Sequence, residues 1–155
     1  MLCVHTVELL PDDELDGVVR AMWDRLAAAG LASLAHHRHP TNRPHLTLAS
    51  GPRPAHVVLD LPLRVTLDGP VRFGGRAALL AWRVVPTREL LDLQARVWRA
   101  MDDPNPLHAP ERWVPHVGLA RRVPPDADIT VGMRHGWLVA ARSYDTDTRT
   151  VVPLR

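Results

Sequence analysis

The two halves of this 155-residue chain carry nearly the same pattern of residues. A shift of 75 positions places Pro11 on Pro86 and Trp23 on Trp98, and it also aligns the apolar residues of two helical patterns. A shift of 71 positions places Pro-His-Leu-Thr-Leu-Ala, residues 44–49, on Pro-His-Val-Gly-Leu-Ala, residues 115–120. Apolar spacing is common to all amphipathic helices, so chance is the competing explanation. The shared Trp, Pro and hexapeptide in one order favour duplication, and two copies are too few for a solenoid.

Each half reads as a strand, an amphipathic helix, an irregular segment and a second strand. The first helix is expected to begin after Asp12, with Gly30 at its C-cap. The second is expected at residues 87–101, because the prolines that follow forbid its continuation. Strands are predicted at residues 2–10, 45–49, 63–67, 76–85, 113–120, 136–144 and 149–154, turns at 68–70, 74–75 and 145–147, and a mostly irregular segment at 31–44.

These elements predict an α+β fold with two similar lobes, each an antiparallel sheet backed by a helix. A pseudo-twofold axis would relate the lobes and leave a central groove between them. The length of 155 residues favours a single bilobal domain over residues 1–155.

Composition narrows the class of protein. No apolar run approaches the roughly 20 residues that span a bilayer, and no basic segment precedes an apolar stretch at the N-terminus, so we expect a cytoplasmic protein without a membrane partner. Cys3 is the single cysteine, which excludes a disulfide scaffold or a cysteine-rich zinc site. All 19 basic residues are arginine against 17 acids, a mild preference for anionic ligands that base composition of the gene also explains.

The repeated hexapeptides carry the residues with chemistry. Side chains alternate across a strand, so His45 and Thr47 share one face, and His116 and Gly118 share the matching face of the second copy. If a twofold axis turns these faces inward, two imidazoles oppose each other across the groove. Such a pair suits a reaction that needs one proton removed and another donated near neutral pH. Thr47 would donate a hydrogen bond to a phosphate oxygen, and no metal or cofactor is required.

The paired His-Leu-Thr-Leu and His-Val-Gly-Leu segments, in a duplicated chain of this length, resemble those of the two-histidine (2H) phosphoesterases. This superfamily contains 2′-5′ RNA ligase-like proteins and cyclic nucleotide phosphodiesterases, and the resemblance covers nearly the whole chain. It implies a bilobal α+β fold and metal-independent hydrolysis of 2′,3′-cyclic phosphates or related phosphodiesters of RNA or nucleotides. It also implies that His45 and His116 act as acid and base and that Thr47 holds the phosphate.

The second copy departs from the family pattern, which has Ser or Thr two residues after each histidine. Gly118 stands there instead, and its backbone N–H is a candidate phosphate donor. Loss of one hydrogen bond to a developing oxyanion costs on the order of 3 kcal/mol, or about a hundredfold in rate. Weakened or lost turnover is therefore the alternative.

Several other residues are candidates for ligand contact. Arg121 is a candidate partner of a substrate phosphate, as are Arg43 and Arg122. Surface arginine is the competing interpretation for all three. Histidines 36, 37 and 39 precede the first motif, but the segment offers no acidic or cysteine ligand, so solvated loop histidines are expected there rather than a metal site. His5 is either a substrate contact or a histidine of the core or the groove edge, and Trp82 and Tyr144 are base-stacking or core residues. Trp23 and Trp98 are expected to be packing residues rather than ligand contacts.

The sequence therefore predicts a 2H-type phosphodiesterase that opens a cyclic phosphate or cleaves a 2′-linked phosphodiester. Two alternatives stay open. One is a non-catalytic module that binds RNA or nucleotide phosphates through a degenerate second motif. The other is RNA ligation, which uses the same phosphoryl chemistry in the reverse direction. Neither the substrate nor the oligomeric state can be read from the sequence.

Overall fold

The computed structural model describes residues 4–155, so Leu2 and Cys3 of the predicted first strand lie outside the described residues. The elements are β1 (His5–Pro11), α1 (Asp13–Ala28), β2 (Ala32–Ser33), β3 (Leu46–Gly51), β4 (Leu63–Phe73), β5 (Ala78–Val84), α2 (Arg88–Ala100), β6 (His116–Val123), β7 (Arg134–Asp145) and β8 (Thr150–Leu154). Two 3-10 helices, η1 (Leu34–His36) and η2 (Pro106–His108), precede the two motif strands β3 and β6.

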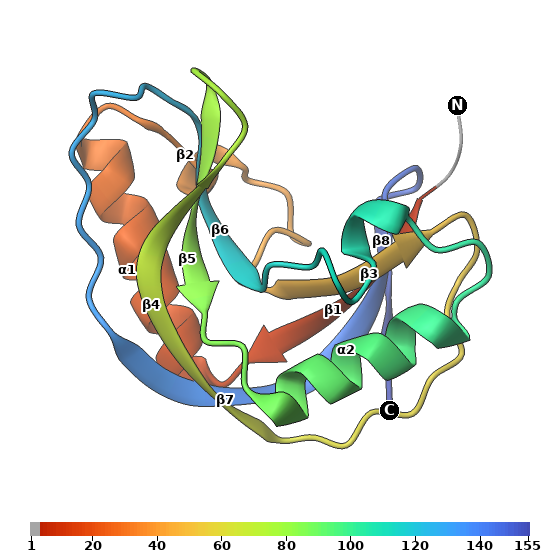
Figure 1. Cartoon of the computed structure of the whole chain (residues 1–155). Coiled ribbons are helices and arrows are strands. Elements are labelled where there is room, and N and C mark those ends of the chain that lie inside the picture. The colour runs from red at the N-terminus through yellow and green to blue at the C-terminus, as the bar shows by residue number, and fades with distance from the viewer. Residues whose placement is uncertain (1–3) are drawn as a thin grey trace.

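The strands form one antiparallel sheet of eight strands in the order β1-β3-β6-β5-β4-β7-β8, with β2 paired to β6. Because β1 also pairs with β7, the hydrogen-bonded path leaves β1 through β3 and returns to it through β7. Figure 1 shows the resulting curved sheet, with α1 at the left of the view and α2 at the lower right. The α+β class is confirmed, whereas two separate sheets are not found.

The two repeat units are joined because each helix packs on the other unit's motif strand. α1 lies between β1 and β3 in the sequence and contacts β6, while α2 lies between β5 and β6 and contacts β3. In the sheet, β3 and β6 are neighbours through the pair Leu46↔Val117, with β1 and β5 outside them. The corresponding strands are thus placed symmetrically about the β3–β6 junction, but two distinct lobes are not confirmed.

The helix boundaries follow from local capping. The Asp12 side chain accepts a 2.8 Å hydrogen bond from the Leu15 N–H, and Thr87 caps α2 in the same way through the Leu90 N–H at 3.3 Å. Gly30 follows the α1 C-cap with φ of +83°, a conformation that glycine adopts without a steric penalty. The predicted helices are therefore confirmed to within one or two residues at most ends.

Two predicted irregular segments are more regular than expected. Residues 68–70 are not a turn, because β4 runs through them with a register shift against β5 between Asp68 and Val71. A bulge absorbs the extra residue, and Gly69 takes φ of +104° within it. Residues 31–44 contain β2 and η1. No helix within residues 4–155 is long and apolar enough to cross a membrane.

Candidate active site

His45 and His116 lie at equivalent positions on the two neighbouring motif strands. His45 directly precedes β3, and His116 is the first residue of β6. Extending the antiparallel register Leu46↔Val117 by one residue places Thr47 opposite His116 and Gly118 opposite His45. The two histidines are therefore diagonal neighbours on one face, and such a pair has Cα atoms ~7–8 Å apart.

The burial pattern fixes which face carries the polar residues. His45, Thr47, His116 and Gly118 are partly exposed, whereas the alternating apolar neighbours in both strands are buried: Leu46, Leu48, Val117 and Leu119. The apolar side chains anchor the strands in the core. Both imidazoles are consequently left on an accessible face of a rigid sheet.

The same backbone contact orients each imidazole. Nδ1 of His45 lies 2.8 Å from the carbonyl oxygen of Arg43, and Nδ1 of His116 lies 2.8 Å from the carbonyl oxygen of Val114. A carbonyl oxygen only accepts, so Nδ1 carries the proton and donates in both rings. Nε2 is then the nitrogen that gains or loses a proton, and it is available for acid–base chemistry on both histidines.

Two tryptophans hold the backbone of the motifs in place. The indole N–H of Trp113 donates to the carbonyl oxygen of Thr47 at 3.1 Å, and that of Trp23 donates to the carbonyl oxygen of Gly118 at 3.0 Å. Trp23 and Trp113 are both buried. Each motif is therefore fixed at the residue two positions after its histidine.

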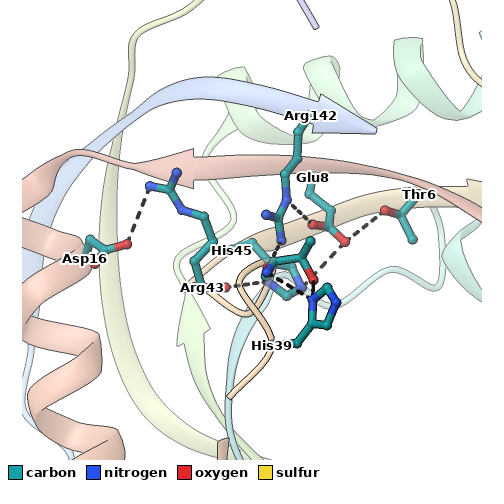
Figure 2. A network of polar contacts seen from close by, with 8 residues as sticks. Thr6, Glu8, Asp16, His39, Arg43, His45 and Arg142 are labelled. Carbon is teal, nitrogen blue, oxygen red and sulfur yellow. Dashed lines mark hydrogen bonds and ion pairs between the residues drawn. The ribbon is translucent and has the colours of Figure 1, made fainter. Parts of the chain in front are cut away.

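A buried acid lies beside His45. Glu8 on β1 is the register partner of both Thr47 on β3 and Arg142 on β7. Its carboxylate accepts from Arg142 Nε at 2.8 Å and from the Thr6 hydroxyl at 2.8 Å, and its Oε2 lies 3.7 Å from Nε2 of His45 (Figure 2). The side chains of Glu8 and Arg142 are only 4% and 8% exposed. The network presents a fixed negative charge to protonated His45.

A hollow of about 450 Å³ opens in front of this network. His45 and Thr47 line it, together with Glu8, Arg142 and Tyr144. Its remaining walls come from β1, from the segment before β3, from β6, and from the β7–β8 hairpin: Thr6, His37, His39, Thr41, Asn42, Arg121, Thr146 and Arg149. His116 and Gly118 are not among its walls, so the hollow extends from the first motif away from the second.

His116 occupies a less solvated environment. Its ring lies against Phe73, with ring centroids 4.5 Å apart and the planes tilted by 45°. Burial lowers the pKa of His116 below its ordinary value of 6.5, the hydrogen bond to Val114 opposes this shift, and the positive charge of His45 lowers it further. His116 therefore favours the neutral form, which is the form that accepts a proton.

His108 in η2 is a third histidine close to the pair. Burial lowers its pKa, and the charge of His116 adds to the effect. Its Nδ1 lies 3.3 Å from the Ser50 hydroxyl, and its carbonyl oxygen accepts from Gln94 at 2.7 Å. The proximity of three histidines means that a proton on one opposes a proton on the next.

The side-chain space at Gly118 is already filled. A Cβ built at this position would lie 3.1 Å from Cδ1 of Leu34 in η1. The hydroxyl that the family pattern places here is thus replaced by a leucine methyl group from another segment. The second motif consequently presents a more apolar surface than the first.

The other candidates divide between the hollow and the rest of the fold. Arg121 lines it, whereas Arg43 turns toward α1 and lies 3.5 Å from Asp16. Trp82 is in the core with its N–H bonded to the Gly132 carbonyl, so it is a packing residue. The remaining placements are Tyr144, His37 and His39 in the hollow, Arg122 and His36 in an adjacent one, His5 on β1, and Trp98 half-buried on α2.

Sequence reasoning missed Glu8, Arg142, Phe73 and His108. Glu8 had a usable signal, because a lone acid inside the apolar run of β1 needs a buried partner. Arg142 is the same kind of exception within β7. Phe73 and His108 had no local signal, because only the folded sheet brings them to His116. Within residues 4–155, no group of three His, Cys, Asp or Glu side chains is arranged to hold a metal ion.

Comparison with known proteins gives one family. The family model of the 2′-5′ RNA ligase superfamily matches residues 57–134, half of the chain. The matched segment runs from before β4 to the start of β7 and contains His116 but not His45. A comparison with curated proteins gave no match. On the family-model match, this chain belongs to the 2′-5′ RNA ligase superfamily, one of the 2H phosphoesterases.

Proposed function

We propose that the chain is a phosphodiesterase acting on 2′,3′-cyclic phosphates or 2′-5′-linked phosphodiesters of RNA or nucleotides. The observation that carries this proposal is the matched orientation of His45 and His116. Both rings donate Nδ1–H to a carbonyl two residues upstream and keep Nε2 for proton transfer. A pair of histidines held in this way can remove one proton and donate another in the same displacement.

The environments of the two rings support different roles. His116, whose pKa burial lowers, is the proposed general base, and its Nε2 takes a proton from the attacking water. His45, with the Glu8 carboxylate 3.7 Å from its Nε2, is the proposed general acid. The water oxygen bonds to phosphorus, the bond to the ribose oxygen breaks, and that oxygen takes the proton from His45. Proton exchange with solvent then restores both histidines.

Thr47 and Arg121 are the proposed phosphate ligands. The Thr47 side chain lies on the His45 face and lines the hollow, where its hydroxyl can donate to a non-bridging oxygen. Arg121 lines the same hollow and supplies a bidentate donor. Leu34 fills the space beside Gly118, so Gly118 is a weaker candidate ligand than either.

The experiment is turnover of nucleoside 2′,3′-cyclic phosphates and 2′-5′ dinucleotides in the presence of a chelator. We expect a monoester product, and we expect His45→Ala and His116→Ala each to abolish it. His56→Ala is the matched control, because His56 is exposed and lines neither the hollow nor its neighbour. Equal turnover by wild type and both variants would refute the proposal.

Two other functions use the same residues. A non-catalytic phosphate-binding module is favoured by Leu34 at the place of the missing second hydroxyl, and it predicts binding of these compounds without turnover. Ligation would place a ribose hydroxyl where hydrolysis places water. RNA carrying a cyclic phosphate at one end and a 5′-hydroxyl at the other distinguishes ligation from hydrolysis. Ligation lengthens or circularises this RNA, whereas hydrolysis only opens its cyclic phosphate.

A further inference from the structure

A second hollow adjoins the one that contains His45 and Thr47. It has a volume of about 380 Å³ and shares four wall residues with the first: His37, His39, Arg121 and Arg149. These residues come from three separate parts of the chain, namely the segment between η1 and β3, strand β6, and the turn between β7 and β8. The shared wall makes the two hollows neighbours along one surface.

The charge along this surface is one-sided. Four arginines line the second hollow and no Asp or Glu does: Arg38, Arg121, Arg122 and Arg149. In the first hollow the single acid is Glu8, which is held by Arg142 at 2.8 Å and faces His45 rather than the shared wall. Placed side by side, these guanidinium groups repel each other, so the arrangement favours a bound anion.

The guanidinium groups on the shared wall are available to a ligand. Arg121 and Arg149 form no salt bridge and no side-chain hydrogen bond within residues 4–155, although Arg20, Arg43 and Arg83 each pair with an acid. Both shared-wall arginines are exposed. Arginine presents a planar fork of donors that matches two oxygens of a phosphate.

If the substrate has one phosphate, the proposed reaction uses Arg121 and leaves Arg149, His37 and His39 without a bound group. The phosphate under attack must lie at the histidines and Thr47, whereas Arg149 lies on the turn between β7 and β8. Ligand pockets of about 300–1,000 Å³ hold small organic molecules, and the first hollow alone is in this range. A nucleoside can therefore extend from the reacting phosphate toward the arginines.

We propose that Arg149, with His37 and His39, binds a second phosphate group of the substrate, beyond the phosphate that reacts and that Arg121 contacts. This inference rests on the proposed function and narrows the substrate to nucleotides with at least two phosphates. The second phosphate is either a terminal 5′-phosphate monoester or the next phosphodiester of an RNA chain. A nucleoside cyclic phosphate without either group would contact the histidines and Thr47 but would leave Arg149 without a phosphate to bind.

The test compares three compounds that share the reacting group. The first is a nucleoside 2′,3′-cyclic phosphate with a 5′-hydroxyl, the second is its 5′-phosphate, and the third is a dinucleotide that ends in the same cyclic phosphate. We expect kcat/KM to be at least about tenfold higher for one of the two compounds that carry a second phosphate, mainly through KM. A higher value for the second compound identifies a monoester, and a higher value for the third identifies an RNA end.

Arg149→Ala is the decisive variant. The measured quantity is kcat/KM for a compound with a second phosphate divided by kcat/KM for the nucleoside 2′,3′-cyclic phosphate with a 5′-hydroxyl. We expect this ratio to fall toward one in Arg149→Ala, to be retained in Arg149→Lys, and to decrease with added salt. Arg76→Ala is the matched control, because Arg76 is an exposed arginine that lines neither hollow.

The outcomes separate this inference from the proposed function. Turnover of all three compounds with a ratio near one in the wild type overturns the second phosphate site alone. Turnover of none overturns the proposed function. In that case equilibrium binding of the same compounds tests the second phosphate site. Tighter binding of a compound with a second phosphate, lost in Arg149→Ala, supports the site. Equal binding of all three compounds overturns it.

Discussion

The Phe73 ring lies 4.5 Å from the His116 imidazole, measured between ring centroids, where β4 ends and β6 begins. This contact removes water from one side of the proposed base. Desolvation disfavours the charged imidazolium, which is why the pKa of His116 is below 6.5. His45 has no such aromatic neighbour among the described residues and faces a carboxylate instead.

The first prediction concerns the pH dependence of turnover. A general base must be neutral, so the acid limb of the kcat/KM profile should lie below pH 6.5 in the wild type. Phe73→Ala admits water, raises the pKa of His116 toward 6.5, and should move the acid limb to higher pH. Val71→Ala on the same strand is the control, and an unmoved limb in Phe73→Ala would show that Phe73 does not desolvate the base.

The second prediction concerns the missing hydroxyl. Gly118→Ser alone should destabilise the fold by about 1–3 kcal/mol, because the new side chain meets Leu34 at 3.1 Å. Combining it with Leu34→Ala makes room, and the added donor should raise kcat by up to about a hundredfold over Leu34→Ala alone. Equal kcat values for the double variant and Leu34→Ala would show that position 118 does not contact the reacting phosphate.

The third prediction concerns the buried ion pair beside His45. Glu8→Gln should cost about 3–5 kcal/mol of unfolding free energy in urea, because it leaves the Arg142 guanidinium buried without its counter-ion. It should also lower kcat, since His45 loses the charge that faces its protonated form. Asp16→Asn is the comparison for stability: it removes the partner of exposed Arg20 and should cost less. A cost no larger than that of Asp16→Asn would contradict this account.

The fourth prediction concerns stability and pH. The pKa values of His108 and His116 are both lowered in the folded state, so the unfolded chain binds more protons just below pH 6.5. Unfolding free energy should therefore decrease as pH falls from 6.5 toward the lowered values. His108→Gln should reduce this decrease, whereas His56→Gln, at an exposed position, should not. Denaturant unfolding of the wild type and both variants at several pH values between 5 and 7 measures this decrease in unfolding free energy.

Local sequence was sufficient to predict the helices and most of the strands, including the two motif strands. Asp12, Gly30 and the prolines marked the helix ends, and strict alternation placed His45 and His116 on the partly exposed face. These features depend on neighbours within about one turn or one strand. The same is not true of residues 68–70, where turn-forming residues accommodate a bulge inside a longer strand.

The rest of the site depends on pairings between distant strands. Glu8 meets Arg142 only because β1 lies between β3 and β7, a contact across 134 residues. Leu34 fills the space at Gly118 only because β2 pairs with β6. The prediction of two separate sheets failed for the same reason, since β3 of one repeat unit pairs with β6 of the other in a single sheet.

The return of the strand path to β1 also bears on when this protein can fold. His5 pairs with Asp145, and Pro11 pairs with Leu138, so β1 acquires its second neighbour only after residues 134–145 have been synthesised. Until then one edge of β1 has open backbone donors and acceptors, and Glu8 has no cation to compensate its burial. A chain truncated before residue 134 should therefore be unable to assemble the His45 environment, so this site can form only after β7 has been synthesised.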